Sequence, residues 1–396
     1  MKRSIKLAVV AALALGATSA FATNGTSLIG YGAKSRAMGG TGVSNFQGAE
    51  SGFNNPALIS NIEGTQVSIG GTYFAPDVTF ESKSPAVPVA PGSHSSDASA
   101  SMIPAVSMAT KVNDNFSWGL ALYGVGGMGV DYRNDAGMGG AAAANDNLLL
   151  MRFSVPFAYN ISGFSIGLSP VIEYGALSMG TGVTTDIAYG FEVGAVYDFK
   201  AIGVEGLSFG LDYKSAVTHD FENTFNSNID PTTGALTTPA QSKLDTPSIL
   251  VAGVSYTFSG NTIALDYKNI GYGSAEGLQD FGWDNQGVVA VGYEYATEGW
   301  AARLGYNYGA SPVNDNVTDP ESFAGAAGSL TQFPGVTESH YTLGGTYNFS
   351  KASSIDVAYV YATGAQSIDI PAGFGGGSIE ATNDQNSLTV AYNMNF

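Results

Sequence analysis

The feature of this sequence that most limits its fold is an alternation of apolar and polar residues that recurs along most of the chain. Because successive side chains of a β-strand point to opposite faces, such alternation predicts strands with one apolar face. Most alternating segments have the length that a tilted strand needs to cross a bilayer, about 9–11 residues. There are fourteen of them: 65–74, 101–112, 115–125, 148–160, 163–177, 184–199, 205–218, 247–258, 261–269, 287–296, 299–310, 337–349, 353–363 and 386–396.

The charged residues of these segments lie on the face opposite the aromatic residues. Asp212 and Lys214, for example, alternate with Phe209, Leu211 and Tyr213. A charge that faces lipid near mid-membrane costs about 2–4 kcal/mol, so a bilayer would impose this partition. A soluble sandwich would also alternate, but its solvated face should carry more charge than a chain with 12% charged residues offers. The same partition holds for Arg152, Glu192, Asp266, Lys268, Glu294, Arg303 and Asp356.

The links between the segments are alternately short and long. Short turns include Asn113-Asp114 and Ser259-Gly260, while the long links are 75–100, 126–147, 219–246, 270–286, 311–336 and 364–385, with one short exception at 178–183. This alternation is typical of an outer-membrane barrel with periplasmic turns and extracellular loops. Residues 64–396 are therefore expected to form an all-β, transmembrane antiparallel β-barrel of about 14 strands, with both chain ends periplasmic. The last strand ends on Phe396, and it resembles the signal that such proteins present to the barrel assembly machinery.

The N-terminus reads as an export signal. Residues 1–22 place Lys2, Arg3 and Lys6 ahead of a short apolar run and end in a small-x-small cleavage pattern. Three of the 15 Lys and Arg lie in this signal, so the mature chain holds 12 against 33 Asp and Glu, a net charge of −21. That charge argues against nucleic acid as a partner. The chain has no cysteine, so disulfides do not stabilise it.

Residues 23–63 differ from the rest of the mature chain. They are rich in Gly and small polar residues and show no alternation. Asn54-Asn55-Pro56-Ala57 reads as a turn into a short helix, with Asn55 as N-cap and Pro56 at the first helical position. From composition alone, a flexible linker is an equally good interpretation.

No motif for catalysis, a metal or a cofactor is found, which argues against an enzyme. The histidines are His94, His219 and His340, and none has a serine at a nucleophile spacing or a partner in a metal motif. The acidic residues Asp315, Asp319 and Glu321 could bind a divalent ion or bridge lipopolysaccharide, but they lack the calcium-loop pattern.

Taken together, the signal, the Gly-rich segment and the strand pattern resemble the FadL family of outer-membrane fatty-acid and hydrocarbon transporters. The similarity rests on Arg36 to Gly42, on Phe53-Asn54-Asn55-Pro56-Ala57, on Ile103-Pro104-Ala105 and on Val112 to Gly119. It implies that residues 23–63 form a plug, or hatch, inside the barrel. It also implies passive transport of fatty acids or hydrocarbons, with sideways exit at an inward kink in a wall strand.

Candidate ligand-binding residues follow from the inward faces of the strands. Leu150, Val171, Val196 and Ile249 could line an apolar pocket beside the plug. If the ligand is a carboxylic acid, a lumen cation should hold its head group. Lys214 and Lys268 each have an acid two residues away and could simply be paired within the wall. We therefore rank Arg152 and Arg303 first, although they too could meet acids across the lumen: Glu173, Glu192, Glu294 or Asp356.

Two further expectations concern the route of the ligand. Ala136 to Asn147 in the link 126–147 is Ala-rich, and we expect part of this link to form a helix over the barrel mouth that presents apolar atoms such as Met128 and Val130 outward. A disordered Gly/Ala loop is an equally good interpretation. A lateral gate is expected where a strand departs from regular pairing, since proline cannot donate a ladder hydrogen bond. The candidates are Pro104, Gly124 and Pro156, with Pro104 and the third segment favoured.

Two other functions are compatible with the sequence: a surface adhesin or receptor whose barrel anchors its loops, and a general porin. The sequence does not distinguish a fatty acid from an alkane or an aromatic ligand.

Overall fold

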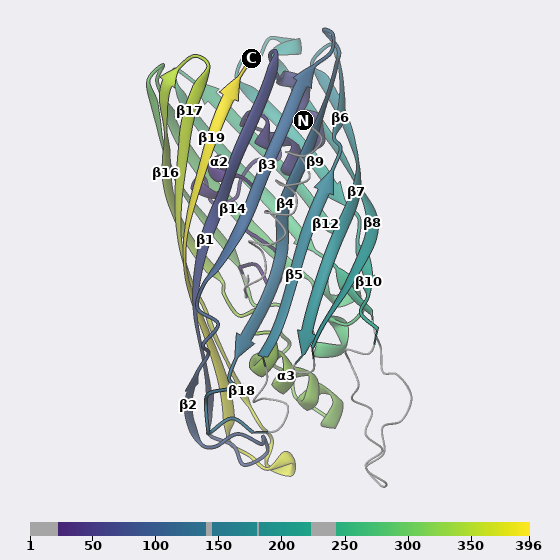
Figure 1. Cartoon of the computed structure of the whole chain (residues 1–396), viewed down its shortest axis with the longest axis vertical. Coiled ribbons are helices and arrows are strands. Elements are labelled where there is room, and N and C mark those ends of the chain that lie inside the picture. Colours follow the sequence, from purple (N-terminus) through teal and green to yellow (C-terminus); the bar gives the residue numbers. More distant parts are fainter. Residues whose placement is uncertain (1–22, 140–144, 180–181, 223–242) are drawn as a thin grey trace.

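The computed structural model describes residues 23–139, 145–179, 182–222 and 243–396. The predicted signal peptide, residues 1–22, lies outside these described residues. The described chain forms one closed antiparallel barrel of fourteen wall strands, because β1 pairs with both β3 and β19 (Figure 1). This confirms the predicted fold class. The wall strands are β1 (Thr65–Ser82), β3 (Ser101–Lys111), β4 (Phe116–Asp131), β5 (Asn145–Ser154), β7 (Phe164–Met179), β8 (Val183–Asp198), β9 (Leu207–Lys214), β12 (Ile249–Phe258), β13 (Asn261–Ile270), β14 (Gln286–Ala296), β15 (Trp300–Gly309), β16 (Ser339–Ser350), β17 (Ser353–Thr363) and β19 (Ser378–Asn395).

Three wall strands are interrupted: the short strand β2 (Gly92–Ser95) precedes β3, β6 (Phe157–Ile161) follows β5, and β18 (Ala365–Asp369) follows β17. The break between β5 and β6 contains Pro156, whose nitrogen cannot donate to a ladder. Backbone bonds from Gly119 N to the Pro156 carbonyl (2.8 Å) and from Val155 N to the Pro170 carbonyl (3.2 Å) keep the wall closed there.

One end of the barrel carries the short turns and the C-terminal Phe396, and we call it the turn end; the opposite end is the loop end. At Ser162-Gly163 and Ser259-Gly260 both residues have positive φ, as a two-residue type I′ hairpin requires. At the loop end, β1, β4 and β19 extend several residues beyond their predicted limits.

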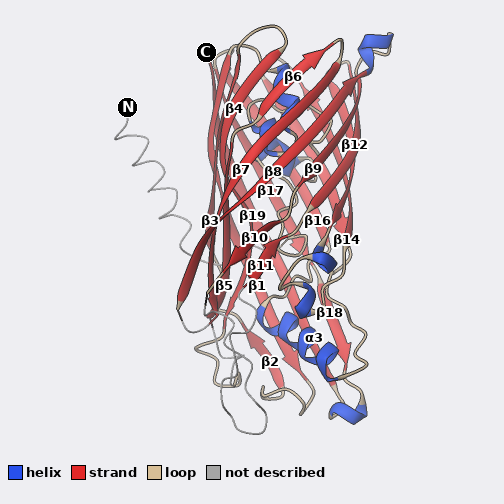
Figure 2. Ribbon diagram, turned by 90° about the vertical axis from the view of Figure 1, so that its right-hand side faces the viewer, coloured by secondary structure: helices blue, strands red, loops and turns tan. Residues whose placement is uncertain are grey.

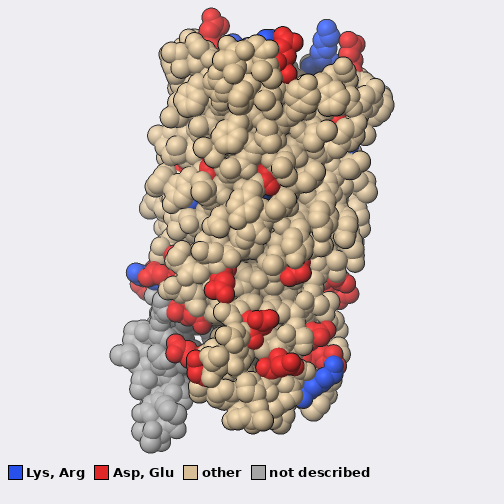
Figure 3. Space-filling model, turned by 180° about the vertical axis from the view of Figure 1, so that it is seen from behind, with Lys and Arg blue, Asp and Glu red and all other residues tan. Residues whose placement is uncertain are grey.

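The two faces of the wall separate as the sequence predicts. Asp212, Lys214, Asp266, Lys268 and Arg152 are all buried on the inner face, whereas Phe209, Leu211 and Tyr213 are exposed on the outer face. Figure 3 shows an outer wall covered mainly by uncharged residues, with Asp and Glu gathered toward the loop end. An apolar belt of this kind suits the hydrocarbon of a bilayer.

Between β9 and β12 the chain leaves the wall. The sequence predicts one strand over 205–218, but after Lys214 the chain turns inward and forms β10 (Val217–Asp220), which pairs with β11 (Lys243–Thr246) in a sheet of its own. Val217 packs beneath Gly190, where a Cβ atom would lie 2.7 Å from its Cγ2. The small inner surface of β8 therefore lets this hairpin enter the lumen.

The helices are short: α2 (Ala33–Ala37), η1 (Glu50–Phe53), η2 (Pro56–Asn61), η4 (Phe199–Ile202), η5 (Tyr272–Ser274), η6 (Gln279–Phe281), α3 (Pro320–Gln332) and η7 (Ala372–Phe374). None of these helices of the described residues is long and apolar enough to cross a membrane.

The prediction of a helix in 126–147 is wrong where the chain is described. Residues 126–131 extend β4, and Met128 and Val130 are buried rather than presented outward. Residues 140–144 of that link lie outside the described residues.

The helix at the loop end instead lies in the acidic link 311–336 (Figure 2). Asp319 caps α3 by accepting hydrogen bonds from the backbone N–H groups of Glu321 and Ser322, and the hydroxyl of Ser322 closes a capping box. These N–H groups lower the pKa of the Asp319 carboxyl. The inner side of α3 buries Ala326 and Leu330 against the interior of the barrel.

Candidate functional site

Residues 23–63, which we call the plug segment, pack against the inner faces of strands all around the wall (Figure 1, dark purple). Arg36 donates to the hydroxyls of Ser387 (2.7 Å) and Thr389 (3.1 Å) on β19. On the other side of the barrel, the carboxylate of Asp266 accepts hydrogen bonds from Gly42 N (2.8 Å) and Val43 N (3.1 Å). Inward polar side chains of the wall thus satisfy the backbone of a segment that lacks regular structure.

The Asn-Pro-Ala run anchors the plug segment to β8 and β9. Asn55 is the N-cap of η2, and its side-chain oxygen accepts from Ala57 N at 3.0 Å. Its amide donates to the carbonyls of Val43 (2.8 Å) and Leu211 (3.1 Å). A single fully buried side chain therefore joins the helix start, the plug interior and the wall.

Glycines of the wall make room for this contact. A Cβ atom on Gly167 of β7 would overlap the backbone of Pro56 and Ala57, and one on Gly194 of β8 would overlap the Asn55 side chain. No other residue type leaves the backbone of a strand open to such an approach.

We expect Asn55→Ala to destabilise the protein by about 1–3 kcal/mol, since it removes a helix cap and leaves buried carbonyls unpaired. Urea unfolding of the purified protein, followed by tryptophan fluorescence, measures this change. Asn45→Ala is the matched control, because Asn45 belongs to the same segment but makes only a long contact to Met38 sulfur, 3.9 Å. Equal stability of the two variants would contradict the anchoring role.

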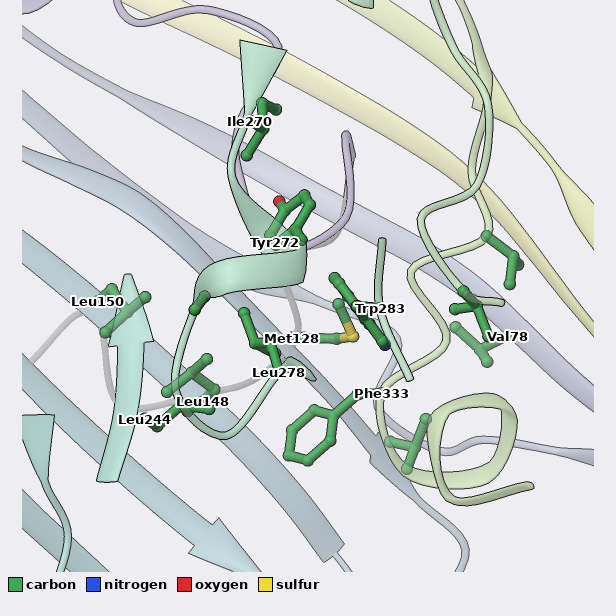
Figure 4. Close-up of a cluster of buried hydrophobic side chains, with 14 of the residues drawn as sticks. Val78, Met128, Leu148, Leu150, Leu244, Ile270, Tyr272, Leu278, Trp283 and Phe333 are labelled. Carbon is green, nitrogen blue, oxygen red and sulfur yellow. The ribbon is translucent and has the colours of Figure 1, made fainter. Parts of the chain in front are cut away.

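Beyond the plug segment, toward the loop end, the lumen is filled by apolar side chains. The cluster includes Met128 and Leu148 from the wall, Leu244 from the inward hairpin, and Trp283 and Phe333 from the loops (Figure 4). It continues to α3 through Leu330. The first residues of the plug segment enter this cluster, where the Tyr272 hydroxyl donates to the Asn24 carbonyl at 2.5 Å.

A small pocket lies between the plug segment and the inner faces of β9, β12 and β13. The space left free in it is about 20 Å³, room for about one water molecule. A larger ligand therefore has to displace side chains to enter. The lining is mixed, with apolar Leu28, Tyr31, Val43, Ile249, Val251 and Ile270 beside polar Ser27, Asn54, Lys214, Asp266 and Lys268.

Both arginines that the sequence ranks first are paired with acids. Arg152 bonds Glu173 through Nη2 (2.6 Å) and Nε (2.8 Å), and both side chains are fully buried. Arg303 bonds Glu294 through Nε (2.6 Å) and donates to the Thr346 hydroxyl (2.8 Å). The sequence leaves open whether these arginines meet acids across the lumen, and the structure shows that Arg152 pairs with Glu173 and Arg303 with Glu294.

The two lysines of the pocket differ from each other. Lys214 is bound by two carboxylates, Glu192 and Asp212, the latter at 2.7 Å. Lys268 instead donates to the Ile29 carbonyl of the plug segment. Asp266, two residues before Lys268 on the same strand, faces the backbone of the plug segment and forms no ion pair with Lys268 within 4.0 Å.

Arg303 lies outside this pocket, in a basin of about 840 Å³ at the turn end. The basin is lined by plug residues such as Lys34 and the half-exposed Phe46, and by many Ser, Thr and Asn side chains of the wall. The plug segment thus separates a polar basin at the turn end from an apolar interior toward the loop end.

A gap in strand pairing lies between β3 and β4. Their ladder ends at Ala105–Tyr123, and within the described residues no ladder pair joins 101–104 of β3 to 124–131 of β4. The edges meet again through the bond from Asp97 N to the Asp131 carbonyl, 2.8 Å. We call this gap the window. Pro104 and Gly124 border it, whereas Pro156 lies at the closed break described above.

β4 bends inward at the window. Its register with β5 shifts between Gly124 and Gly126, and its freed backbone binds the plug segment: Gly127 N donates to the Thr26 carbonyl (3.0 Å), and Leu28 N donates to the Val125 carbonyl (3.4 Å). The Ile103 side chain fills the gap and packs against Gly124, where a Cβ atom would lie 2.5 Å from its Cγ2.

Sequence reasoning missed several residues of this site. Tyr272 and Trp283 come from the link 270–286, for which the sequence predicts only a loop, and Ile103 stands out in the sequence only beside Pro104. No local pattern marks any of them, because their neighbours come from distant parts of the chain.

Comparison with known proteins places this architecture in a family. Residues 7–185 and 178–396 match the family described as outer membrane protein transport protein (OMPP1/FadL/TodX). A long-chain fatty acid transport protein of Salmonella typhi is 25% identical over 384 residues, which cover 81% of this chain and 82% of that protein.

Solved structures share the fold. A FadL homologue of Pseudomonas aeruginosa superimposes with a TM-score of 0.71 at 17% identity, covering 94% of this chain and 100% of the other. The toluene transporter TodX of P. putida gives 0.66 at 18% identity, covering 93% and 99%. The barrel has an apolar outer belt, and the family match extends over nearly the whole chain. The chain therefore belongs to the OMPP1/FadL/TodX family of outer-membrane transport proteins.

Proposed function

We propose that this protein carries hydrophobic molecules passively across the outer membrane and releases them sideways into the bilayer. The observation that carries the proposal is the position of the apolar cluster. It fills the lumen between α3 and the plug segment, and Met128 of β4 brings it to the edge of the window. A hydrophobic molecule would exchange water for this cluster, which is the driving force for binding.

A sideways exit suits such a ligand better than an axial one. The straight route would lead past the fully buried plug residues into the polar basin at the turn end, where an apolar molecule would be exposed to water again. The window would instead lead toward the hydrocarbon of the membrane once the Ile103 side chain, which fills it, moves aside. In this proposal residues 23–63 act as the plug, the turn end faces the periplasm and the loop end faces the outside.

Several partners follow from the same arrangement. The exposed aliphatic and aromatic side chains of the wall contact outer-membrane lipid, and lipopolysaccharide surrounds the loop end. The C-terminal strand β19, paired with β1 and ending beside Phe396, engages the barrel assembly machinery during insertion. The names of the relatives, a fatty acid transport protein and a toluene transporter, suggest ligands that range from fatty acids to small aromatics.

Extraction of the purified protein with organic solvent, followed by mass spectrometry, tests the proposal. We expect co-purified lipid or hydrocarbon and, in proteoliposomes, uptake of a hydrophobic probe that depends on the protein. Swelling of the same liposomes in small sugars would indicate a porin instead. If the proteoliposomes show neither uptake of the probe nor swelling, the protein is instead a surface adhesin or receptor.

A further inference from the structure

Two carboxylates of the wall hold the inward hairpin β10–β11 in the lumen. Glu173 of β7 accepts a hydrogen bond from the Thr246 hydroxyl, and its Oε1 lies 3.3 Å from Nε2 of His219. Asp186 of β8 accepts from the backbone N–H of Asp220 at 3.0 Å, and its Oδ2 lies 3.4 Å from Nδ1 of His219. The imidazole of His219 thus lies between both carboxylates, whereas the side chain of Asp220 is exposed.

The protonated imidazole fits this position better than the neutral one. The side chain of His219 is fully buried, so water cannot replace a missing partner. A neutral imidazole donates from one nitrogen only, and the lone pair of its other nitrogen would then face a carboxylate. An imidazolium donates from both nitrogens. It also balances the charge, because Glu173 and Asp186 carry two negative charges and Arg152, which binds Glu173, carries one positive charge.

The other charged groups of the neighbouring strands turn to partners of their own. On β11, Lys243 lies 3.7 Å from the carboxylate of Glu276, and Asp245 accepts from the backbone N–H of Glu276 at 3.0 Å. On β8, Glu192 binds Lys214 of β9. The charge state of the imidazole is therefore set mainly by the two wall carboxylates that face it.

The hairpin places an apolar side chain where a ligand would pass. Leu244 lies opposite His219 in the hairpin, and it belongs to the same apolar cluster as Leu148 and Leu278 (Figure 4). The members of this cluster are buried against one another, so an entering ligand has to displace some of them. Because β10 and β11 form a sheet of their own, the hairpin can shift without breaking a ladder of the wall.

We propose that His219 is a proton-sensitive latch: its imidazolium form holds the inward hairpin against the two wall carboxylates and keeps Leu244 in the apolar cluster, and loss of the proton loosens the hairpin and makes room for ligand. Since the docked hairpin favours the protonated imidazole, docking is in turn favoured at low pH and weakens as the pH rises. Histidine changes charge between about pH 5 and 8. The effect on uptake rests on the proposed function, whereas the movement of the hairpin does not.

A spin label on Thr218→Cys measures the movement directly. Thr218 is exposed beside His219, and the chain has no other cysteine. Electron paramagnetic resonance of the purified protein in detergent should show a mostly immobile label at about pH 5.5 and a mobile one at about pH 8. We expect the ratio of mobile to immobile label to rise about tenfold or more, as for the loss of one hydrogen bond to a charged group. Uptake of pyrene, which is uncharged, into proteoliposomes should rise over the same range.

Three variants in this background identify the group that titrates. His219→Gln cannot change its charge, so both responses to pH should be lost. Asp186→Asn removes one of the two carboxylates at a partly exposed position and should reduce both responses. His94→Gln is the matched control, because it removes another buried histidine that faces a carboxylate, Asp135 at 3.0 Å, but lies on β2; both responses should persist. Heat-modified gel mobility confirms that each variant forms a closed barrel.

A label whose mobility does not change with pH, or falls as the pH rises, would overturn the latch, and so would an unchanged response in His219→Gln. The same measurements separate this inference from the proposed function. Uptake of pyrene without a response of the label leaves the transporter standing and removes the latch. A response of the label that requires His219, with no uptake at any pH, supports the movement of the hairpin and contradicts the proposed function.

Discussion

A disulfide across the window should slow uptake of a hydrophobic probe about tenfold or more, which corresponds to about 1.4 kcal/mol added to the barrier. Ile103→Cys with Gly124→Cys provides it. A Cβ atom on Gly124 would lie 3.8 Å from the Cβ of Ile103, close to the mean separation in disulfides, about 3.8 Å. The chain has no cysteine of its own, so only this bridge can form. The bridge would hold residue 103, which fills the gap, against the bent strand β4, and the window could then not open.

Reduction is the internal control of this experiment, because uptake should return when the bridge is broken. Ser107→Cys with Ala121→Cys is the matched variant. These residues face each other where β3 and β4 are already paired, so a bridge there should leave uptake unchanged. Normal uptake with the 103–124 bridge fully formed would show that the ligand leaves by another route, such as the turn end.

Filling the space between wall and plug should open the lumen to small polar solutes. In the double variant Gly167→Ala with Gly194→Ala, the added methyl groups would overlap the backbone of Pro56 and Ala57 and the side chain of Asn55. Overlap with backbone atoms cannot be relieved by a rotamer change, so the plug segment has to move. A fourteen-strand barrel is wide enough to conduct once its lumen is cleared.

Single-channel conductance in planar bilayers measures this effect. We expect the unmodified protein to stay closed and the double variant to show discrete openings. Gly71→Ala is the control, since its methyl group would lie 3.3 Å from the nearest atom, the Ile103 carbonyl oxygen, and would not touch the plug segment. A double variant that folds but stays closed would mean that residues 23–63 do not seal the barrel.

The wall of this protein could be read from local pattern alone. A period of two fixes which residues share a face, and the cost of charge in lipid fixes which face is inside. For that reason Asp212, Lys214, Asp266 and Lys268 could be assigned to the lumen, and the strand limits at β12, β13 and β17 could be placed within two residues. The N-cap role of Asn55 was also readable, because Asn before Pro is a local signal.

The lumen could not be read in this way, since its contacts join residues far apart in the chain. Lys214 and Lys268 each follow an aspartate by two residues, yet their surroundings differ. Lys214 forms ion pairs with Asp212 and with Glu192 of the neighbouring strand. Asp266, in contrast, accepts hydrogen bonds from the backbone of the plug segment and forms no ion pair with Lys268 within 4.0 Å. The inward bend of β4 depends likewise on bonds to Thr26 and Leu28. By itself the sequence determined the barrel, its orientation of faces and the existence of a distinct N-terminal segment, because these depend on local periodicity and composition. Only the tertiary structure decided which lumen cations pair with acids and where two wall strands stay unpaired, because both depend on which side chains the closed barrel brings together.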